Sequence, residues 1–447
     1  MRTSLIATAI VAAIASVANA SGPLPAPIAC DDPSLPNPVY IQCGDTQQNL
    51  MLNLGRALRA NSTPITLIWI TAPSCNNIDL MYTNGKIGDG STAGGSETAL
   101  GYVPSVAQDA TWTPSDGTAS CNLPVGGVAP DVGNSALYNS ACTAAPAQPA
   151  NVYLAGSPAS QTGQNQTGGL GPKQAYVLAV PRGTSVNAIT AEEAYFLFGF
   201  GPTILAAMSA AIDPWTDEMQ LFIRKNGTST LLAWGANLGI PATAFHGVQE
   251  GSSQIVVTAL TGANDAQAIG MIGAEVYDTL RAQLQTLAFR AFGQYAAYFP
   301  DSTATSRDKK NLRDGHYTVW SPTVWMDHTD GVATATYPQG TPLNQNARYV
   351  IDIINNQDPT PTGIPAPSFD TQAVVASVGL VPDCAMRVQR SFEGAPLSLY
   401  TPLAPPNGPG SCTCKFEATV DVTSCATCDD STPCATGVCR AGYCEEF

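Results

Sequence analysis

The stretch "LFIRKNGTSTLLAWGANLGI", from Leu221 to Ile240, contains the features that decide the fold. "LFIR" has the apolar run typical of a buried strand, and "STLLAWGANLGI" favours a helix. Between the two lie Arg224 and the run from Gly227 to Thr230. The pattern therefore predicts a strand that turns directly into a helix, which is the repeating unit of an α/β protein.

The same turn concentrates hydrogen-bond donors. The first-turn amides of a helix have no intrahelical acceptor, and the positive end of the helix dipole lies at the same place. The hydroxyls of Thr228, Ser229 and Thr230 add donors, and the Arg224 guanidinium can bind an oxyanion through two parallel bonds. The alternative is a Ser/Thr-capped helix beside a surface arginine, which any α/β protein can show. Taken alone, the stretch favours this alternative.

Outward from this turn, strand and helix patterns alternate. "PVYIQCG" predicts a short strand, and "TPITLIWITA" predicts a second strand that is buried on both faces. Between them, "DTQQNLMLNLGRALRAN" has Leu50, Leu54 and Leu58 at helical spacing, with Asp45 or Thr46 placed to cap the helix. Strand, helix and strand in this order indicate the opening of a parallel α/β sheet.

The later chain continues the alternation. "KQAYVLAVPRG" predicts a buried strand, "NAITAEEAYFLFGFG" an amphipathic helix, and "SSQIVVTAL" with "DAQAIGMIG" a further helix and strand. "LRAQLQTLAFRAFGQYAAYF", residues 280–299, has strong helical periodicity, and "NLRDGHYTVWSPTVW" returns to a strand pattern. Residues 84–127 are rich in Gly, Ser and Thr and predict long loops with a few strand-like pieces. Residues 402–410 read as a linker.

Composition narrows the function classes. The 447 residues are enough for two or three domains, and 44% hydrophobic with 12% charged residues argues against disorder. The 19 basic and 34 acidic side chains give a net charge of −15, which excludes the basic stripe of a nucleic-acid binder. Only three histidines occur, and no nucleophile or metal-ligand motif is found. We therefore expect no enzyme activity, no cofactor and no metal.

The N-terminal residues 1–20, "MRTSLIATAIVAAIASVANA", have one basic residue, an apolar centre and a small-residue Ala-Asn-Ala end. This pattern predicts a cleaved signal peptide, followed by a Pro-rich leader over residues 21–37. No later segment has the run of about 20 apolar residues that a membrane span needs. We expect an exported chain, periplasmic or secreted, without stable membrane insertion.

Thirteen cysteines fit an oxidising compartment. Seven of them crowd into the tail, residues 411–447, where "CATCDDSTPCATGVCRAGYC" has almost no apolar filler. We favour disulfides over zinc there, because the tail has no histidine. Cys384 is expected to pair with Cys412 or Cys414, which leaves six tail cysteines for three bridges. The odd total requires at least one thiol that is free or paired with another chain. The tail is interpreted as a disulfide-rich appendage that adds stability, with surface attachment as the alternative.

The turn from Arg224 to Thr230 also carries a family resemblance. "RKNGTST" resembles the Arg-x-x-Gly-Ser-Gly-Thr segment of periplasmic phosphate-binding proteins, the solute-binding components of phosphate ABC import. "YIQCGDTQQNLMLNLGRAL", "NAITAEEAYFLFGFG" and "DAQAIGMIG" are similar to other segments of that family and occur in the same order. The resemblance spans residues 38–322 as scattered short motifs. It implies a type II periplasmic-binding-protein-like fold, with two α/β lobes over residues 38–400 and the second lobe at about 185–290. Two crossing strands would join the lobes, with an oxyanion between them and an ABC permease as partner.

The resemblance also implies a set of ligand-binding residues. They come from four segments of the chain: Arg224, Thr228, Ser229 and Thr230; Asp45 and Thr46; Ser74; and Ser135 in "PDVGNSALY". The family's second Asp in that last segment, which accepts the proton of monohydrogen phosphate, aligns with Ala136 here. Residues 227–228 read Gly-Thr where the family has Ser-Gly. An all-donor pocket would favour a fully ionised oxyanion such as sulfate, unless Asp45 supplies the missing acceptor from the other wall.

These observations predict an exported solute-binding-like protein that binds a small tetrahedral oxyanion, with phosphate as the first candidate. The alternative is a secreted structural or adhesive protein that keeps the binding-protein fold without binding a ligand. Ala136 and the Cys-rich tail favour that alternative.

Overall fold

The computed structural model of the chain describes residues 27–88, 100–104, 118–155, 171–263, 266–402, 410–421 and 423–445. The expected signal peptide and residues 21–26 of the expected leader lie outside the described residues. So do residues 89–99 and 105–117 of the Gly/Ser/Thr-rich stretch, and residues 403–409 of the expected linker.

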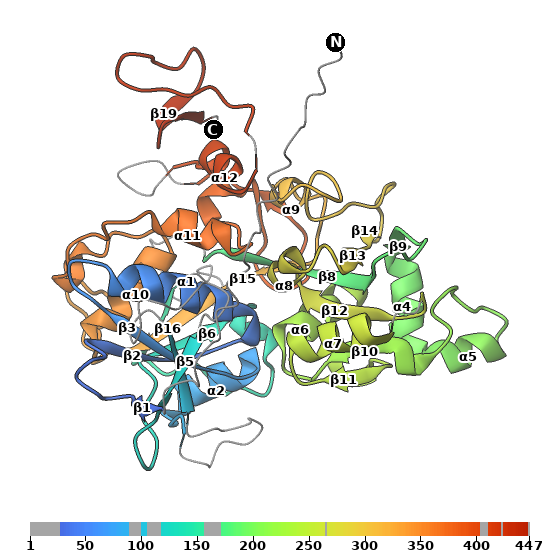
Figure 1. Ribbon diagram of the computed structural model, residues 1–447, viewed down its shortest axis with the longest axis horizontal. Helices are drawn as coiled ribbons and strands as arrows, with labels where there is room; N and C mark the ends of the chain where they lie inside the picture. Colours follow the sequence, from blue (N-terminus) through green and yellow to red (C-terminus); the bar gives the residue numbers. More distant parts are fainter. Residues whose placement is uncertain are drawn as a thin grey trace, which may run out of the picture.

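The described chain forms two α/β lobes, which lie side by side in Figure 1. The first lobe contains an eight-stranded sheet in the order β1-β5-β4-β3-β2-β6-β16-β7. Its strands are β1 (Ile28–Ala29), β2 (Pro38–Cys43), β3 (Thr66–Thr71), β4 (Leu100–Pro104), β5 (Thr118–Asn122), β6 (Val132–Ser135), β7 (Val152–Ala155) and β16 (Val324–His328). Its longer helices are α1 (Gln48–Arg59), α2 (Ser74–Thr83), α10 (Gln345–Ile354) and α11 (Thr371–Ser377).

The start of the first lobe follows the predicted strand, helix and strand. β2 and β3 run parallel in a continuous register from Pro38 opposite Thr66 to Cys43 opposite Thr71. The leucines at helical spacing on α1 are fully buried, and they pack in one core with β2, β3 and α10. Burial of this apolar face is what fixes the helix on the sheet.

The second lobe contains a six-stranded sheet, in which β11-β10-β12-β8-β13 are neighbours and β15 pairs with β8. Its strands are β8 (Lys173–Pro181), β10 (Leu221–Arg224), β11 (Val248–Glu250), β12 (Ile269–Gly273), β13 (Leu284–Thr286) and β15 (Trp320–Pro322). Its helices are α4 (Ala191–Phe200), α5 (Pro202–Ala207), α6 (Ser229–Leu238), α7 (Ser253–Ala263) and α8 (Ala274–Thr279). The predicted helix in "NAITAEEAYFLFGFG" is α4, which begins with a capping box between Thr190 and Glu193.

The helix predicted over residues 280–299 is wrong. The chain there forms β13 and then β14 (Ala288–Arg290), which pairs with β9 (Ala188–Thr190). β13 closes one edge of the second sheet, with Leu284 opposite Pro181 and Thr286 opposite Ala179. β13 and β14 pair with β8 and β9, which lie about 100 residues earlier, and this pairing overrides the local helical period. The apolar side chains of the segment are buried in the core of the second lobe from these strands.

Three segments connect the lobes, where the resemblance implied two. β7 belongs to the first sheet and the next strand, β8, belongs to the second, and the chain returns at Thr323, between β15 and β16. It crosses a third time after α11, where Val381 forms an antiparallel bridge with Lys173. The buried Lys173 ammonium also contacts Asp383 at 2.7 Å. The last crossing therefore attaches to the same strand end as the first.

The tail forms a small appendage above the first lobe in Figure 1. It contains α12 (Thr413–Val420) and the hairpin β19 (Val438–Arg440) and β20 (Tyr443–Glu445). The bridges Cys414–Cys425, Cys428–Cys439 and Cys434–Cys444 confirm disulfides over zinc, and Cys384–Cys412 confirms the expected tie to the main body. Cys428, Cys434 and Cys444 approach one another, but each is in a disulfide.

The first lobe has two more bridges, Cys30–Cys121 and Cys75–Cys142. The remaining cysteine, Cys43, is a buried free thiol, which accounts for the odd number. No helix within the described residues has the length and apolar character needed to cross a membrane.

Candidate functional site

Four helical segments begin at one place between the lobes. The short 3-10 turn Asp45–Gln47 leads into α1, and the starts of α2, α6 and α7 face it. A cavity of about 340 Å³ lies among them, and we call it the interlobe pocket. Its walls include Asp45, Ser74, Arg224, Lys225, Thr228, Ser229 and Ser252. The positive ends of several helix dipoles therefore point into one cavity, which favours negative charge there.

Arg224 is the last residue of β10, and its side chain is only 1% exposed. β10 lies between β11 and β12 and is parallel to both, so its carboxyl end opens toward the cleft. Ligands of parallel α/β sheets bind at this end of the strands. The alternative hypothesis, that Arg224 is a surface arginine, is therefore wrong, because its side chain is buried.

Asp45 reaches across the cleft to Arg224. Arg224 Nη1 donates to Asp45 Oδ2 at 3.1 Å, and Nη2 donates to Oδ1 at 3.2 Å. The backbone amide of Ser253, the first residue of α7, donates to Asp45 Oδ2 at 2.7 Å. The guanidinium also contacts the Ser253 hydroxyl and the Gly251 carbonyl. The carboxylate of the chain itself therefore occupies a donor set that suits an oxyanion.

The sequence predicted that Asp45 or Thr46 would cap α1, but Asp45 does not cap it. α1 begins at Gln48, and neither the helix nor the 3-10 turn before it has a side-chain cap bond. The carboxylate instead binds the first amide of α7 in the other lobe, where Arg224 adds a full positive charge. Burial alone would raise the pKa of Asp45, but Arg224 and the Ser253 bonds outweigh it and hold that pKa below its ordinary value. The side chain is therefore a fixed anion at neutral pH.

The start of α6 is held against the first lobe without a side-chain cap. Thr228 occupies the N-cap position, but its hydroxyl donates to the Lys225 carbonyl at 2.8 Å. The amide of Cys75 donates to the Gly227 carbonyl at 3.1 Å, across the cleft. Gly227 has a φ of +83°, which a residue with a side chain rarely adopts. The hypothesis that a Ser or Thr side chain caps α6 is therefore also wrong, and the start of α6 at Thr228 and Ser229 lines the pocket without a side-chain cap.

Five of the predicted site residues line the pocket: Asp45, Ser74, Arg224, Thr228 and Ser229. Three do not. The Thr46 hydroxyl donates to Gln174 Oε1 on β8 at 3.2 Å, and the Ser135 hydroxyl donates to the Leu137 carbonyl at 2.9 Å. Thr230 is 1% exposed within α6 and does not contribute to the lining.

Ala136, at the position of the missing acid, offers backbone groups to both lobes. Its amide donates to the Ser74 hydroxyl at 3.3 Å, and its carbonyl accepts a bond from the Tyr176 hydroxyl of β8. The sequence interpretation missed Tyr176 and Ser253. The Gly251-Ser252-Ser253 run before an apolar helical pattern is the signal that could have identified Ser253.

Comparison with known proteins finds likeness only among solved structures. A chain from Clostridium perfringens assigned as a phosphate ABC transporter substrate-binding protein, with bound phosphate, is 11% identical with a TM-score of 0.42; the match covers 77% of this chain and 99% of that one. An ABC-type phosphate transport receptor from Vibrio cholerae is 10% identical with a TM-score of 0.37, covering 77% and 99%. The reduced OxyR regulatory domain from Pseudomonas aeruginosa is 9% identical with a TM-score of 0.34, covering 75% and 100%. No protein-family model matches the sequence, and no curated protein matches it.

Proposed function

We propose that the chain is an exported binding protein that takes a small tetrahedral oxyanion, with phosphate as the first candidate, and performs no chemistry on it. The observation that carries this proposal is a buried arginine at a point where four helical segments begin. Arg224 Nε is buried without a partner among the described residues, so Asp45 does not satisfy every donor of the guanidinium.

Asp45 gives the proposed site its preference among anions. Its side chain is 21% exposed, and among the described residues Oδ1 accepts one bond, from Arg224. A carboxylate oxygen has two lone pairs, so Oδ1 can accept a further proton donor. Monohydrogen phosphate has such a proton, whereas sulfate has none and would be repelled by the carboxylate. Phosphate therefore fits the pocket better than sulfate.

Ser74, the α6 amides and Lys225 supply the remaining donors in this proposal. The Ser74 hydroxyl accepts the Ala136 amide, which leaves its own proton available to an oxyanion. Lys225 is exposed at the pocket rim, where its charge attracts anions in a chain with a net charge of −15. Export is supported by the signal-like N-terminus and by the disulfides. Delivery of the ligand to an ABC permease belongs to the same proposal.

The Asp45–Arg224 ion pair also supports a second candidate. Because the two side chains largely compensate each other, the lobes can stay together without a ligand. This favours a secreted structural or adhesive protein that retains the fold.

Isothermal calorimetry on the purified oxidised chain distinguishes the two candidates. Phosphate and arsenate, which both hold a proton near neutral pH, are expected to bind, and sulfate is expected to bind much more weakly. A protein that gives no heat and no thermal shift with any of the three anions would support the structural candidate. Preference for sulfate over phosphate would rule out Asp45 as the acceptor.

A further inference from the structure

The appendage and the first lobe enclose a second cavity, which we call the junction pocket. It has a volume of about 510 Å³ and lies between α10, α11, the Cys384–Cys412 disulfide and the tail. It shares no lining residue with the interlobe pocket. Its volume lies within the range of about 300–1,000 Å³ that is usual for small-molecule sites.

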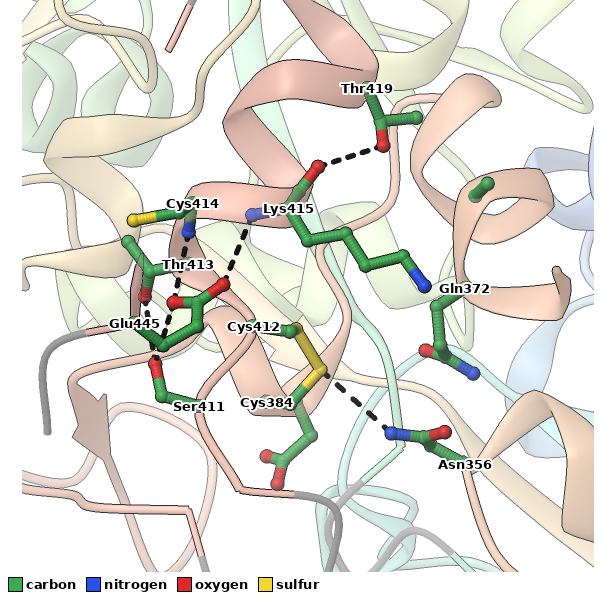
Figure 2. The surroundings of a disulfide bond; sticks show 12 residues. Asn356, Gln372, Cys384, Ser411, Cys412, Thr413, Cys414, Lys415, Thr419 and Glu445 are labelled. Carbon is green, nitrogen blue, oxygen red and sulfur yellow. Dashed lines mark hydrogen bonds between the residues drawn. A yellow bond between two sulfur atoms is a disulfide. The ribbon is translucent and has the colours of Figure 1, made fainter. Parts of the chain in front are cut away.

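Bonds around the disulfide hold the appendage in place, as Figure 2 shows. The buried carboxylate of Glu445 accepts the backbone amides of Cys414 and Lys415, each at 3.1 Å, at the start of α12. The Cys412 amide donates to the Cys384 carbonyl at 3.0 Å, beside their disulfide. These bonds fix the direction of the Lys415 side chain, which extends from α12 toward Gln372 of α11 (Figure 2). The pocket is therefore a built feature that requires the docked appendage.

The charges of the junction pocket differ from those of the whole chain. Lys415 and Arg440 line it from the appendage, and Asp370 lines it from the first lobe. Lys415 forms an ion pair with Asp370. Among the described residues no carboxylate pairs with Arg440. Its guanidinium packs against the Gly410 backbone, where a Cβ added to Gly410 would lie 2.5 Å from Arg440 Cζ. Within the part of the chain that the structure describes, one positive charge of the pocket therefore has no paired carboxylate, although the whole chain has a net charge of −15.

The same pocket has uncharged polar groups that are poorly satisfied. Asn356 Nδ2 donates only to the Cys384 sulfur within the described residues, at 3.9 Å, and sulfur is a weak acceptor. The Thr371 hydroxyl is buried without a partner among the described residues, in a residue that is 7% exposed. A buried hydroxyl without a partner is costly, and the half-buried Asn356 amide has only a weak bond, so the two groups together favour a ligand with hydroxyl groups or an ordered water.

An apolar wall completes the cavity. Phe369, Pro359 and Pro367 line it together with Ile353 of α10. An aromatic ring and two proline rings present flat apolar surface, which suits the C–H face of a sugar ring better than a compact inorganic anion.

We propose that the junction pocket binds a hydroxylated carboxylate of the sugar-acid class, such as a hexuronate. Arg440 binds the carboxylate through its planar fork, which matches two carboxylate oxygens. Asn356 and Thr371 bind ring hydroxyls, and the ring face packs on Phe369. The same chemistry is offered by a free sugar acid and by a uronate residue of a polysaccharide. The appendage is then part of a binding site and not only a disulfide-stabilised end.

Calorimetry on the oxidised full chain tests this proposal with sodium D-glucuronate, with D-glucose as the uncharged analogue and with acetate as the carboxylate without a ring. We expect glucuronate to bind at least about tenfold more tightly than either control, because only it uses the fork, the hydroxyl partners and the wall together. Arg440→Gln should weaken glucuronate by about tenfold or more. The matched control is Arg290→Gln, which removes an exposed cation from the second lobe and should leave binding unchanged.

Phosphate is titrated against the same variants. Arg440→Gln should leave any phosphate binding unchanged, which separates this proposal from that for the interlobe pocket. Glucuronate that binds no better than glucose, or equally to wild type and a folded Arg440→Gln variant, would overturn the proposal. An oligouronate that binds more tightly than the monomer supports a polysaccharide source, and equal affinity supports the free sugar acid.

Discussion

Asp45 and Arg224 join the two lobes from opposite walls of the interlobe pocket, through two bonds of 3.1 and 3.2 Å between side chains that lie 179 positions apart in the sequence. Each side chain depends on the other. Arg224 would be a buried cation without Asp45, and Asp45 holds the first amide of α7 only because the second lobe is closed on it. The pair is therefore both a structural contact and the electrostatic centre of the proposed site.

Removing the guanidinium should harm both roles. Arg224 Nε is the one guanidinium donor without a partner among the described residues, and a bond to a charged group contributes about 1.5–3 kcal/mol, so Arg224→Ala should weaken phosphate binding by about tenfold to a hundredfold. Breaking a buried pair also leaves Asp45 uncompensated, which should lower the free energy of unfolding by about 3 kcal/mol. Arg224→Lys should recover only part of the binding, because an ammonium lacks the planar fork. Calorimetry and urea unfolding measure the two effects.

Lys225→Ala is the control for Arg224→Ala, because Lys225 is the exposed neighbour on the same turn. It should change phosphate affinity by less than about tenfold and leave stability unchanged. A folded Arg224→Ala protein that binds phosphate as tightly as the wild type would remove this pocket from consideration.

Asp45→Asn tests the form of the ligand. If Asp45 accepts the proton of monohydrogen phosphate, Asn should reduce phosphate affinity and narrow the gap between phosphate and sulfate. If phosphate and sulfate both bind more tightly to the variant, the carboxylate was a repulsive neighbour and the pocket is an all-donor site. Competition titrations with the two anions on both proteins give the answer.

The same substitution has a pH signature. The pKa of Asp45 is lower in the folded protein than its ordinary value of 3.8, so ionised Asp45 stabilises the fold above that value. This contribution is lost as pH falls through the folded pKa. The wild type should therefore be more stable than Asp45→Asn at pH 7, and the difference should shrink below about pH 4. A difference that is constant with pH would show that the ionised form is not the stabilising one.

Local sequence patterns predicted those parts of the fold in which strand, turn and helix are neighbours in the chain. β2, α1 and β3 follow one another, and the leucine spacing of α1 is enough to orient it. The helix prediction for residues 280–299 was wrong because these residues pair with β8, which lies about 100 positions earlier in the chain. The third crossing depends on the bridge between Val381 and Lys173, for which the sequence carries no local signal.

The candidate site likewise has a part that local sequence could predict and a part that depends on contacts between distant segments. Arg224 and the donors at the start of α6 belong to one turn, so their proximity could be predicted. The contact between Asp45 and the Ser253 amide spans 208 positions and depends on how the lobes meet. Thr46 and Ser135 were expected near the ligand from their segments, but side-chain direction within a turn is set by local partners, here Gln174 and the Leu137 carbonyl.

Asp352 of α10 should make stability fall as pH rises. It is 9% exposed, and burial raises its pKa to about 7, although Arg348 one turn earlier favours the ionised form. The folded protein keeps this proton up to about pH 7, whereas the unfolded chain releases it near 3.8, so the carboxyl opposes folding increasingly between those values. Asp352→Asn should therefore be more stable than the wild type by about 1–3 kcal/mol at pH 7.5 and equal to it at pH 4. Urea unfolding at the two pH values measures the difference.

The control is the neighbouring carboxylate that is paired. Asp327 accepts two bonds from Arg348, at 2.8 and 2.9 Å, and Asp327→Asn should destabilise the protein by about 3 kcal/mol at pH 7.5. If Asp352→Asn is as harmful as Asp327→Asn, Asp352 is an ionised partner of Arg348 and the assigned direction of its pKa shift is wrong.

Two helical glycines of the second lobe should respond to alanine with opposite signs. Gly235 lies in α6, where an added Cβ would be 2.7 Å from the Ile240 carbonyl oxygen. That carbonyl belongs to the turn that ends α6, in which the amides of Gly239 and Ile240 both donate to the Gly235 carbonyl. The turn cannot move away without breaking these bonds, so Gly235→Ala should lower the free energy of unfolding by about 1–3 kcal/mol.

Gly262, in the last turn of α7, has no atom within 4 Å of the place where an added Cβ would lie. Gly262→Ala should therefore stabilise the protein by up to about 1 kcal/mol, because alanine is the better helix former. Thermal unfolding of both variants measures the effect, and a Gly235→Ala protein as stable as Gly262→Ala would show that α6 does not end against Ile240 as described.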